Sequence, residues 1–245
     1  MPSGPQNESD RASRIEGSRS TVELTAPECK QGRPRGRPKV KPDEEQISEI
    51  VAVARKLFIA QGYAGTTMDD IAAGCRISKR TLYRLFPSKL EVFAGIVRDN
   101  RPAMLALPAD YHDLPVAEAL ERIFRVDLDL EAEKQRLEIV RIIVVEGTKH
   151  PELMEIGKRE GGDLSRADLA AWLRTRTQSG ELEIDDADAH AHILMDMIFG
   201  IFVVRSAPSY EPLIGTERVQ HVRRCIKIFL KGVQAPVENK VRRLG

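Results

Sequence analysis

Apolar positions recur from Asp43 onward at the three- and four-residue spacing of helices that bury one face. The first stripe consists of Ile47, Ile50, Val51, Ala54, Leu57 and Phe58. Asp43 is predicted to cap this helix and Gly62 to end it. Two short helices are predicted to start at Thr67 and Ser78, and a fourth helix at the Ser-x-x-Glu capping box of residues 88–91.

The helical pattern continues beyond residue 100, and proline and glycine residues separate its segments. Predicted helices occupy residues 115–133, 135–148, 151–178, 186–206 and 216–232. The β-branched stretch 139–145 could be mistaken for a buried strand, but its flanks are helical and no partner strand is evident. The sequence therefore predicts an all-α protein.

Three regions are expected along the chain. Residues 1–42 are rich in Pro, Gly, Ser and Arg and are predicted to be a disordered basic arm. Residues 43–100 are expected to be a three-helix helix-turn-helix DNA-binding domain. Residues 101–245 are expected to be a helical bundle for ligand binding and dimerisation.

Charge is distributed unevenly in this chain of net charge +1. Residues 30–42 contain six basic residues and no acidic residue, and residues 76–89 contain five basic residues and no acidic residue. Such local cationic segments indicate a polyanionic partner. In a helix-turn-helix around residues 75–77, the second short helix would enter the DNA major groove, where Arg and Lys reach guanine edges and polar side chains reach phosphates.

Residues 47–97 resemble the DNA-binding domain of the tetracycline-repressor (TetR) family, and the block TLYRLFPSK at residues 81–89 is the most specific part of the match. The matching positions include Ala54, Leu57, Phe58, Gly62, Thr67, Ile71, Ala72, Ser78, Thr81, Leu82, Tyr83, Phe86, Ser88 and Lys89. The resemblance implies a homodimeric, ligand-responsive regulator, most often a repressor, that binds a palindromic operator. Two positions depart from the family pattern, because Arg76 replaces the usual turn glycine and Leu85 replaces a frequent His or Tyr. A left-handed turn at Arg76 costs about 1 kcal/mol more than at glycine.

The predicted DNA contacts of the folded domain come from the helix-turn-helix and the residue that opens the next helix. They are Thr67, Ser78, Lys79, Arg80, Thr81, Tyr83, Arg84 and Lys89.

The arm contains a second candidate DNA contact, because residues 34–38 (PRGRP) resemble an AT-hook. Arg35 and Arg37 would be drawn to the negative potential of an A·T-rich minor groove, with Gly36 allowing close approach and Pro38 keeping the chain extended. The alternative is a solvated basic linker.

Two apolar helix faces near the C-terminus are predicted to form a dimer interface, since a reader of two half-sites needs a symmetric dimer. The predicted interface residues are Ile193, Leu194, Met197, Ile198, Ile201, Phe202, Val222, Ile226 and Phe229. The alternative is ordinary core packing within one protomer.

The sequence gives no catalytic residues, metal ligands or cofactor motif. Its three cysteines have no metal-site spacing, and His190 and His192 point to different helix faces. No apolar run is long enough to span a membrane and no secretory signal is evident, so a bacterial cytoplasmic protein, on the nucleoid when bound to DNA, is expected. Cys75 is expected to be a buried structural thiol.

The sequence therefore predicts a transcriptional regulator that binds double-stranded DNA, with an unidentified small-molecule effector in the bundle of residues 101–180. The effector would move the helix containing residues 90–97 and change the spacing of the two DNA-binding heads. Four residues could line its cavity or simply pack in the core: Trp172, Met154, Phe124 and Met104. The alternatives are an architectural protein that binds A·T-rich DNA through the arm without an effector, and a helical enzyme.

Overall fold

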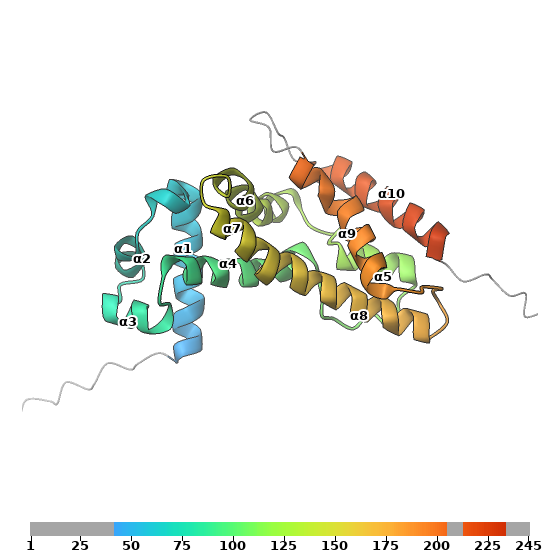
Figure 1. Cartoon of the computed structure of the whole chain (residues 1–245), viewed down its shortest axis with the longest axis horizontal. Helices are drawn as coiled ribbons and strands as arrows, with labels where there is room; N and C mark the ends of the chain where they lie inside the picture. Colours follow the sequence, from blue (N-terminus) through green and yellow to red (C-terminus); the bar gives the residue numbers. More distant parts are fainter. Residues whose placement is uncertain (1–41, 205–212, 234–245) are drawn as a thin grey trace, which may run out of the picture. The chain divides into compact units, whose positions relative to one another are not determined.

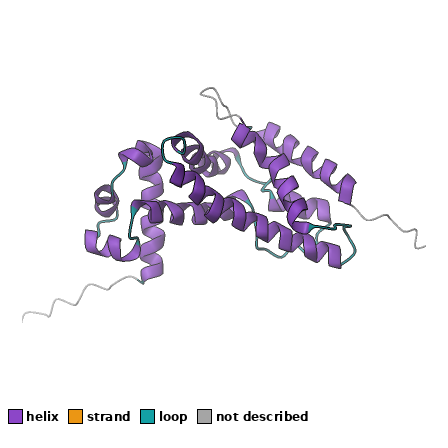
Figure 2. Ribbon diagram, viewed as in Figure 1, coloured by secondary structure: helices purple, strands orange, loops and turns teal. Residues whose placement is uncertain are grey.

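The computed structural model describes residues 42–204 and 213–233, with only the backbone of residues 201–204. Helices account for the regular structure of these residues, and no strand occurs among them (Figures 1 and 2). The helices are α1 (Asp43–Gly65), α2 (Met68–Gly74), α3 (Lys79–Leu85), α4 (Lys89–Met104), α5 (Val116–Ile123), α6 (Leu130–Glu146), α7 (Pro151–Ile156), the π-helix η1 (Gly157–Asp163), α8 (Leu164–Gln178), α9 (Ala187–Val204) and α10 (Gly215–Val233). The all-α prediction is confirmed. None of these helices is long and apolar enough to cross a bilayer.

Helix α1 starts differently from the prediction, but its regular part ends where the prediction placed it. The prediction that Asp43 caps it is wrong, because Pro42 occupies the cap position and Asp43 lies in the first turn. The prediction that Gly62 ends the regular helix is confirmed: its φ of 76° and ψ of 166° break α1 one turn before Gly65. This backbone region is essentially restricted to glycine.

The two short helices are defined by local caps, as predicted. Thr67 and Asp70 form a reciprocal capping box at the start of α2, and the hydroxyl of Ser78 accepts a hydrogen bond from the amide of Thr81 in α3. Arg76 adopts a left-handed φ of 54° in the turn between the two helices, as the family comparison predicted. Only half of the expected capping box opens α4, where Ser88 accepts from the amide of Glu91.

The structure divides one of the predicted helices in two. The predicted helix 115–133 is wrong: α5 ends at Ile123, Arg125 has a left-handed φ of 55°, and Asp129 caps a new helix, α6. The β-branched stretch 139–145 lies within α6 and is helical, as expected. The segment 151–178 is helical throughout, with the π-helix η1 between α7 and α8.

Two clusters of buried side chains hold the described residues together. One cluster joins α1–α4 to α6 and α7, and includes Phe58, Leu82 and Phe93 together with Ile139 and Leu153. The second joins α5 to α8, α9 and α10. The predicted boundary at residue 100 falls inside α4, so the helix-turn-helix is built onto the same core as the start of the bundle.

Candidate nucleic-acid interface

Helix α3 has one buried side and one exposed side. Leu82 is fully buried beneath it, and Phe86, just after its last turn, is buried too. Lys79, Arg80 and Arg84 are exposed, and Tyr83 is 49% exposed. The structure therefore brings three cations and an aromatic hydroxyl to the exposed side of α3.

Two of these cations have acidic partners that a count along the sequence misses. Arg84 donates to both carboxylate oxygens of Asp43 at 2.7 and 2.8 Å, and Lys79 contacts Asp69 at 2.7 Å. The hydrogen bond to Arg84 lowers the pKa of the Asp43 carboxyl, and the hydrogen bond to Asp69 raises the pKa of the Lys79 ammonium. Both pairs are solvent-exposed and therefore weak, so a phosphate can replace either carboxylate. Arg80 forms no ion pair with any residue that the structure describes.

The predicted hydroxyl contacts are engaged in the caps. The hydroxyl of Thr67 donates to the Asp70 carboxylate at 2.6 Å, and the hydroxyls of Ser78 and Thr81 lie 2.8 Å apart. Each remains exposed or half-buried, so their contact with DNA stays a prediction. The AT-hook-like residues 34–38 lie outside the described residues.

Lys89 has a structural role that the sequence did not reveal. Its ammonium donates to the backbone carbonyls of Tyr63 and Thr66 at 2.7 and 2.8 Å and lies 4.2 Å from the centre of the Tyr63 ring. Burial lowers its pKa. A phosphate contact by Lys89, which remains a prediction, would compete with these bonds.

Helix α6 contacts the same segment, residues 63–66 between the break in α1 and the start of α2, through Glu146, another residue that sequence reasoning missed. Its carboxylate accepts hydrogen bonds from the backbone amides of Tyr63 and Ala64 at 2.8 and 3.1 Å. These amides follow the break in α1 at Gly62 and precede α2. A helix of the bundle therefore holds the backbone that leads into the helix-turn-helix, through a side chain 82 and 83 positions away in the sequence.

A cavity of about 330 Å³ lies beside the second half of α4. We call it the α4–α9 cavity, because α4, α6, α7, η1, the start of α8 and α9 line it. Its walls are mainly apolar and include Val97, Met104, Leu105, Val144 and Met154, with Asn100 as a buried polar group. Met104 and Met154 both line this cavity, and effector binding by it stays a prediction.

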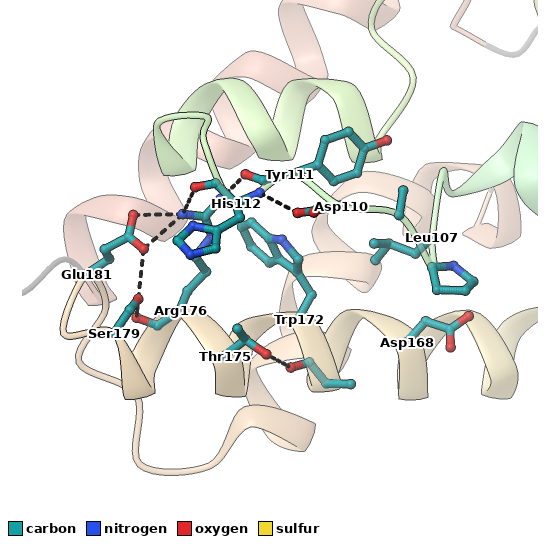
Figure 3. Close-up of a pocket in the computed structure, with 13 residues that line it drawn as sticks. Leu107, Asp110, Tyr111, His112, Asp168, Trp172, Thr175, Arg176, Ser179 and Glu181 are labelled. Carbon is teal, nitrogen blue, oxygen red and sulfur yellow. Dashed lines mark hydrogen bonds and ion pairs between the residues drawn. The ribbon is translucent and has the colours of Figure 1, made fainter.

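A second cavity of about 340 Å³ lies between the loop after α4 and helix α8 (Figure 3). We call it the α8 cavity. Trp172 lines it, whereas Phe124 belongs to the buried core beside α5. The four candidate lining residues therefore do not converge on one site.

The predicted dimer residues divide by their burial. Leu194, Ile198, Val222, Ile226 and Phe229 are buried against side chains of the same chain, and Met197 is half-buried. Ile193 is 53% exposed. The side chains of Ile201 and Phe202 lie outside the described residues. Packing within one protomer accounts for the five buried residues. A contact of the nine predicted residues with a second copy of the chain stays a prediction.

A tight turn between two capped helices, the second exposing cations, is the arrangement with which many regulators enter the DNA major groove. It defines the class of helix-turn-helix DNA-binding proteins. Residues 50–96 match the family described as bacterial regulatory proteins, tetR family, and residues 118–232 match the AefR-like transcriptional repressor C-terminal domain. The chain belongs to the TetR family and is a transcriptional regulator.

Relatives of known sequence and structure agree with this assignment. The uncharacterized regulator Rv1556 of Mycobacterium tuberculosis is 29% identical over 161 residues, which cover 65% of this chain and 75% of the relative. UidR of Escherichia coli is 28% identical over 163 residues, covering 63% and 78%. The solved structure of the flavonoid-responsive regulator FrrA is 28% identical, with a TM-score of 0.57 and coverage of 80% of this chain and 100% of FrrA. A TetR-family regulator from Mesorhizobium loti, at 22% identity and a TM-score of 0.61 over 80% of this chain and 100% of its own, shares the fold.

Proposed function

We propose that this regulator is a ligand-responsive repressor that binds a palindromic operator as a homodimer and is released by a small molecule in the α4–α9 cavity. The observation that supports this is the position of the cavity on α4. The second half of that helix lines the cavity, while its first half packs in the core of the DNA-binding block, by which we mean α1–α3 and the first half of α4. No catalytic step or cofactor is part of the proposal, and its site of action is the bacterial cytoplasm and nucleoid.

Hydrogen bonds connect the cavity to the DNA-binding block through Asn100 of α4. Its side-chain oxygen accepts from Arg55 of α1 at 3.1 Å, and its amide donates to the backbone carbonyl of Arg136 in α6 at 3.1 Å. Glu146, on the helix that also supplies Val144 to the cavity, holds the start of the helix-turn-helix. A ligand that separates α4 from α6 would therefore disturb two contacts of the DNA-binding block. It shifts the equilibrium only if it binds the two arrangements with different affinity.

Binding of the effector in the α4–α9 cavity is tested by filling that cavity with a larger side chain. Val144→Trp places an indole in the α4–α9 cavity, and Val145→Trp is its matched control, because Val145 is the next residue of α6, is 60% exposed and does not line the cavity. We expect both variants to bind operator DNA, as measured by fluorescence anisotropy, and only Val144→Trp to lose release by the effector. Equal release from both variants would place the effector elsewhere.

Candidate effectors are drawn first from flavonoids, because the structural relative FrrA is named as flavonoid-responsive. The cavity is of a size that suits small drug-like molecules and its walls are mainly apolar, which fits compounds of this kind. Release of the labelled operator is the measurement.

The dimer is tested at the exposed apolar positions of the last two helices. Ile193 of α9 and Ile228 of α10 are 53% and 58% exposed, and burial between two copies would remove both from water. We expect Ile193→Glu and Ile228→Glu to weaken the dimer in light-scattering measurements and to weaken operator binding with it. An unchanged dimer in both variants would place the interface elsewhere.

The PRGRP sequence of residues 34–38 favours a second candidate, an architectural protein that binds A·T-rich DNA through its arm. Deletion of residues 1–42 separates the two candidates. The repressor should keep its sequence preference with weaker affinity, measured by selection from random duplex DNA at near-physiological salt. Loss of nearly all binding would favour the architectural protein.

A further inference from the structure

The α8 cavity has no part in the proposed repressor mechanism, and its chemistry differs from that of the α4–α9 cavity. Figure 3 shows residues 107–112 of the loop facing helix α8 across the cavity. Trp172 stands between Arg176 at one end of the cavity and Asp168 at the other, with Asp110 and Leu107 facing it from the loop. Trp172 is also the single tryptophan of the chain.

The charged side chains of the α8 cavity leave it net negative. Three carboxylates line it, those of Asp110, Asp168 and Glu181, against one cation, Arg176. The guanidinium of Arg176 is almost fully buried and is already matched, because it donates to Glu181 at 2.8 and 2.9 Å and to the backbone carbonyls of three loop residues: Tyr111, His112 and Leu114. Its charge is therefore matched within the wall, and its guanidinium carbon lies over the Trp172 ring, 5.2 Å from the ring centre. Of the two aspartates, Asp168 is paired with Arg101 of α4, and Asp110 forms no ion pair with any residue that the structure describes.

Asp168 is incompletely satisfied. One of its carboxylate oxygens, Oδ2, is buried and accepts no hydrogen bond. That oxygen lies 2.9 Å from Nη2 of Arg101 in α4, at ion-pair distance but without hydrogen-bond geometry. Arg101 lines the α4–α9 cavity and Asp168 lines the α8 cavity, so this ion pair joins a residue of one cavity to a residue of the other.

We infer that the α8 cavity binds a small organic cation of the alkylated-ammonium class, held against Trp172 between Asp110 and Asp168. Attraction of a cation to an indole strengthens when water is excluded, and methylated ammonium groups also bury apolar surface against walls such as Leu107 and Ala171. A metal ion suits the site less well, because hard cations need six or more oxygen ligands. No cluster of three or more candidate metal ligands occurs among the residues that the structure describes.

The fluorescence of Trp172 provides a direct test that needs neither DNA nor an effector. The full-length protein is titrated with tetramethylammonium chloride, with sodium chloride at equal ionic strength and with the neutral molecule tert-butanol in parallel, and calorimetry provides a second measurement of binding. We expect a saturable change in fluorescence and a saturable heat for tetramethylammonium alone. An equal response to tert-butanol, or no saturable response in either measurement, would overturn the inference.

Three substitutions locate the binding. Asp168→Asn should weaken tetramethylammonium binding by about tenfold, a loss expected for removing a close opposite charge. Asp113→Asn is the matched control, because Asp113 is an exposed aspartate of the same loop that does not line the cavity, and it should bind as the parent does. Arg101→Gln removes the competing cation and should tighten binding by about threefold or more. Far-ultraviolet circular dichroism checks that each variant is folded, and unchanged affinity in both Asp168→Asn and Arg101→Gln would contradict the assignment.

Because these measurements concern binding at the α8 cavity alone, they can fail while the proposed repressor mechanism stands. Equally, the protein could bind tetramethylammonium in the α8 cavity even if no candidate effector of the α4–α9 cavity released it from DNA.

Discussion

Substitution of Gly62 should reveal how closely the bundle is joined to the DNA-binding block. Gly62 has a φ of 76° and a ψ of 166°, a conformation that other residues adopt only with strain. A Cβ atom at this position would lie 3.0 Å from Oε1 of Glu146, the same oxygen that accepts the amide hydrogen of Tyr63. Gly62→Ala therefore strains the backbone and also pushes the carboxylate from its hydrogen bonds.

The size of the effect follows from three contributions. Strain at such a position costs about 1–3 kcal/mol. Replacing glycine lowers the entropy of the unfolded chain, which offsets about 0.4–1 kcal/mol. Weakening the two hydrogen bonds to Glu146 adds about 1 kcal/mol. We expect Gly62→Ala to lower the free energy of unfolding by about 2 kcal/mol, and the melting temperature by about 4–8 °C for a domain of this size.

Urea unfolding followed by circular dichroism measures this change, and two comparisons separate its causes. Gly180→Ala is a matched control, since Gly180 also has a positive φ of 78° but a Cβ there meets nothing within 4 Å. In a Glu146→Ala background, the cost of Gly62→Ala should fall by about 1 kcal/mol, because the contact is already absent. An equal cost in both backgrounds would refute the contact with Glu146. A variant within about 0.5 kcal/mol of the parent would refute the strain as well.

Three further predictions concern single side chains. Arg80→Gln should reduce the slope of log affinity against log salt for DNA by about 1, whereas Arg224→Gln, an exposed change on α10, should leave it unchanged. Cys75 is buried and burial raises the pKa of its thiol, so in a variant whose other cysteines are serine it should react with a disulfide reagent far more slowly in the folded protein than in urea. A hydrogen bond from the buried Arg176 lowers the pKa of the Glu181 carboxyl. The ionised carboxylate therefore stabilises the fold at pH values above 4.5, the ordinary pKa of glutamate, and this contribution is lost as the pH falls through the lowered pKa. Melting curves of Glu181→Gln and the parent should therefore differ at pH 7 and converge in acid; a constant difference would contradict the ion pair.

Much of the helix-turn-helix could be predicted because its determinants are local. The caps at Thr67 and Ser78 and the break at Gly62 each depend on residues within four positions, and the side-chain types reveal them. The left-handed turn at Arg76 was accessible only through the family resemblance, since arginine itself gives no signal for that conformation. The apolar periodicity likewise established an all-α fold.

Predictions that depended on neighbours distant in sequence were less complete. The apolar stripe that follows Asp43 predicts a cap at that residue, but in the fold its carboxylate pairs with Arg84, 41 positions away. The apolar set on α9 and α10 showed that these faces are buried, yet periodicity does not distinguish burial within one chain from burial between two copies.

The sequence by itself determined the all-α fold, the caps at Thr67 and Ser78 and the exposed cations of α3, because short-range hydrogen bonds and the helical period depend on neighbouring residues. Only the tertiary structure decided which charges are paired, that Glu146 holds the entry to the helix-turn-helix, and where the two cavities lie. These features arise where helices far apart in the chain meet, and the geometry of such meetings depends on the packing of the whole core rather than on any local pattern.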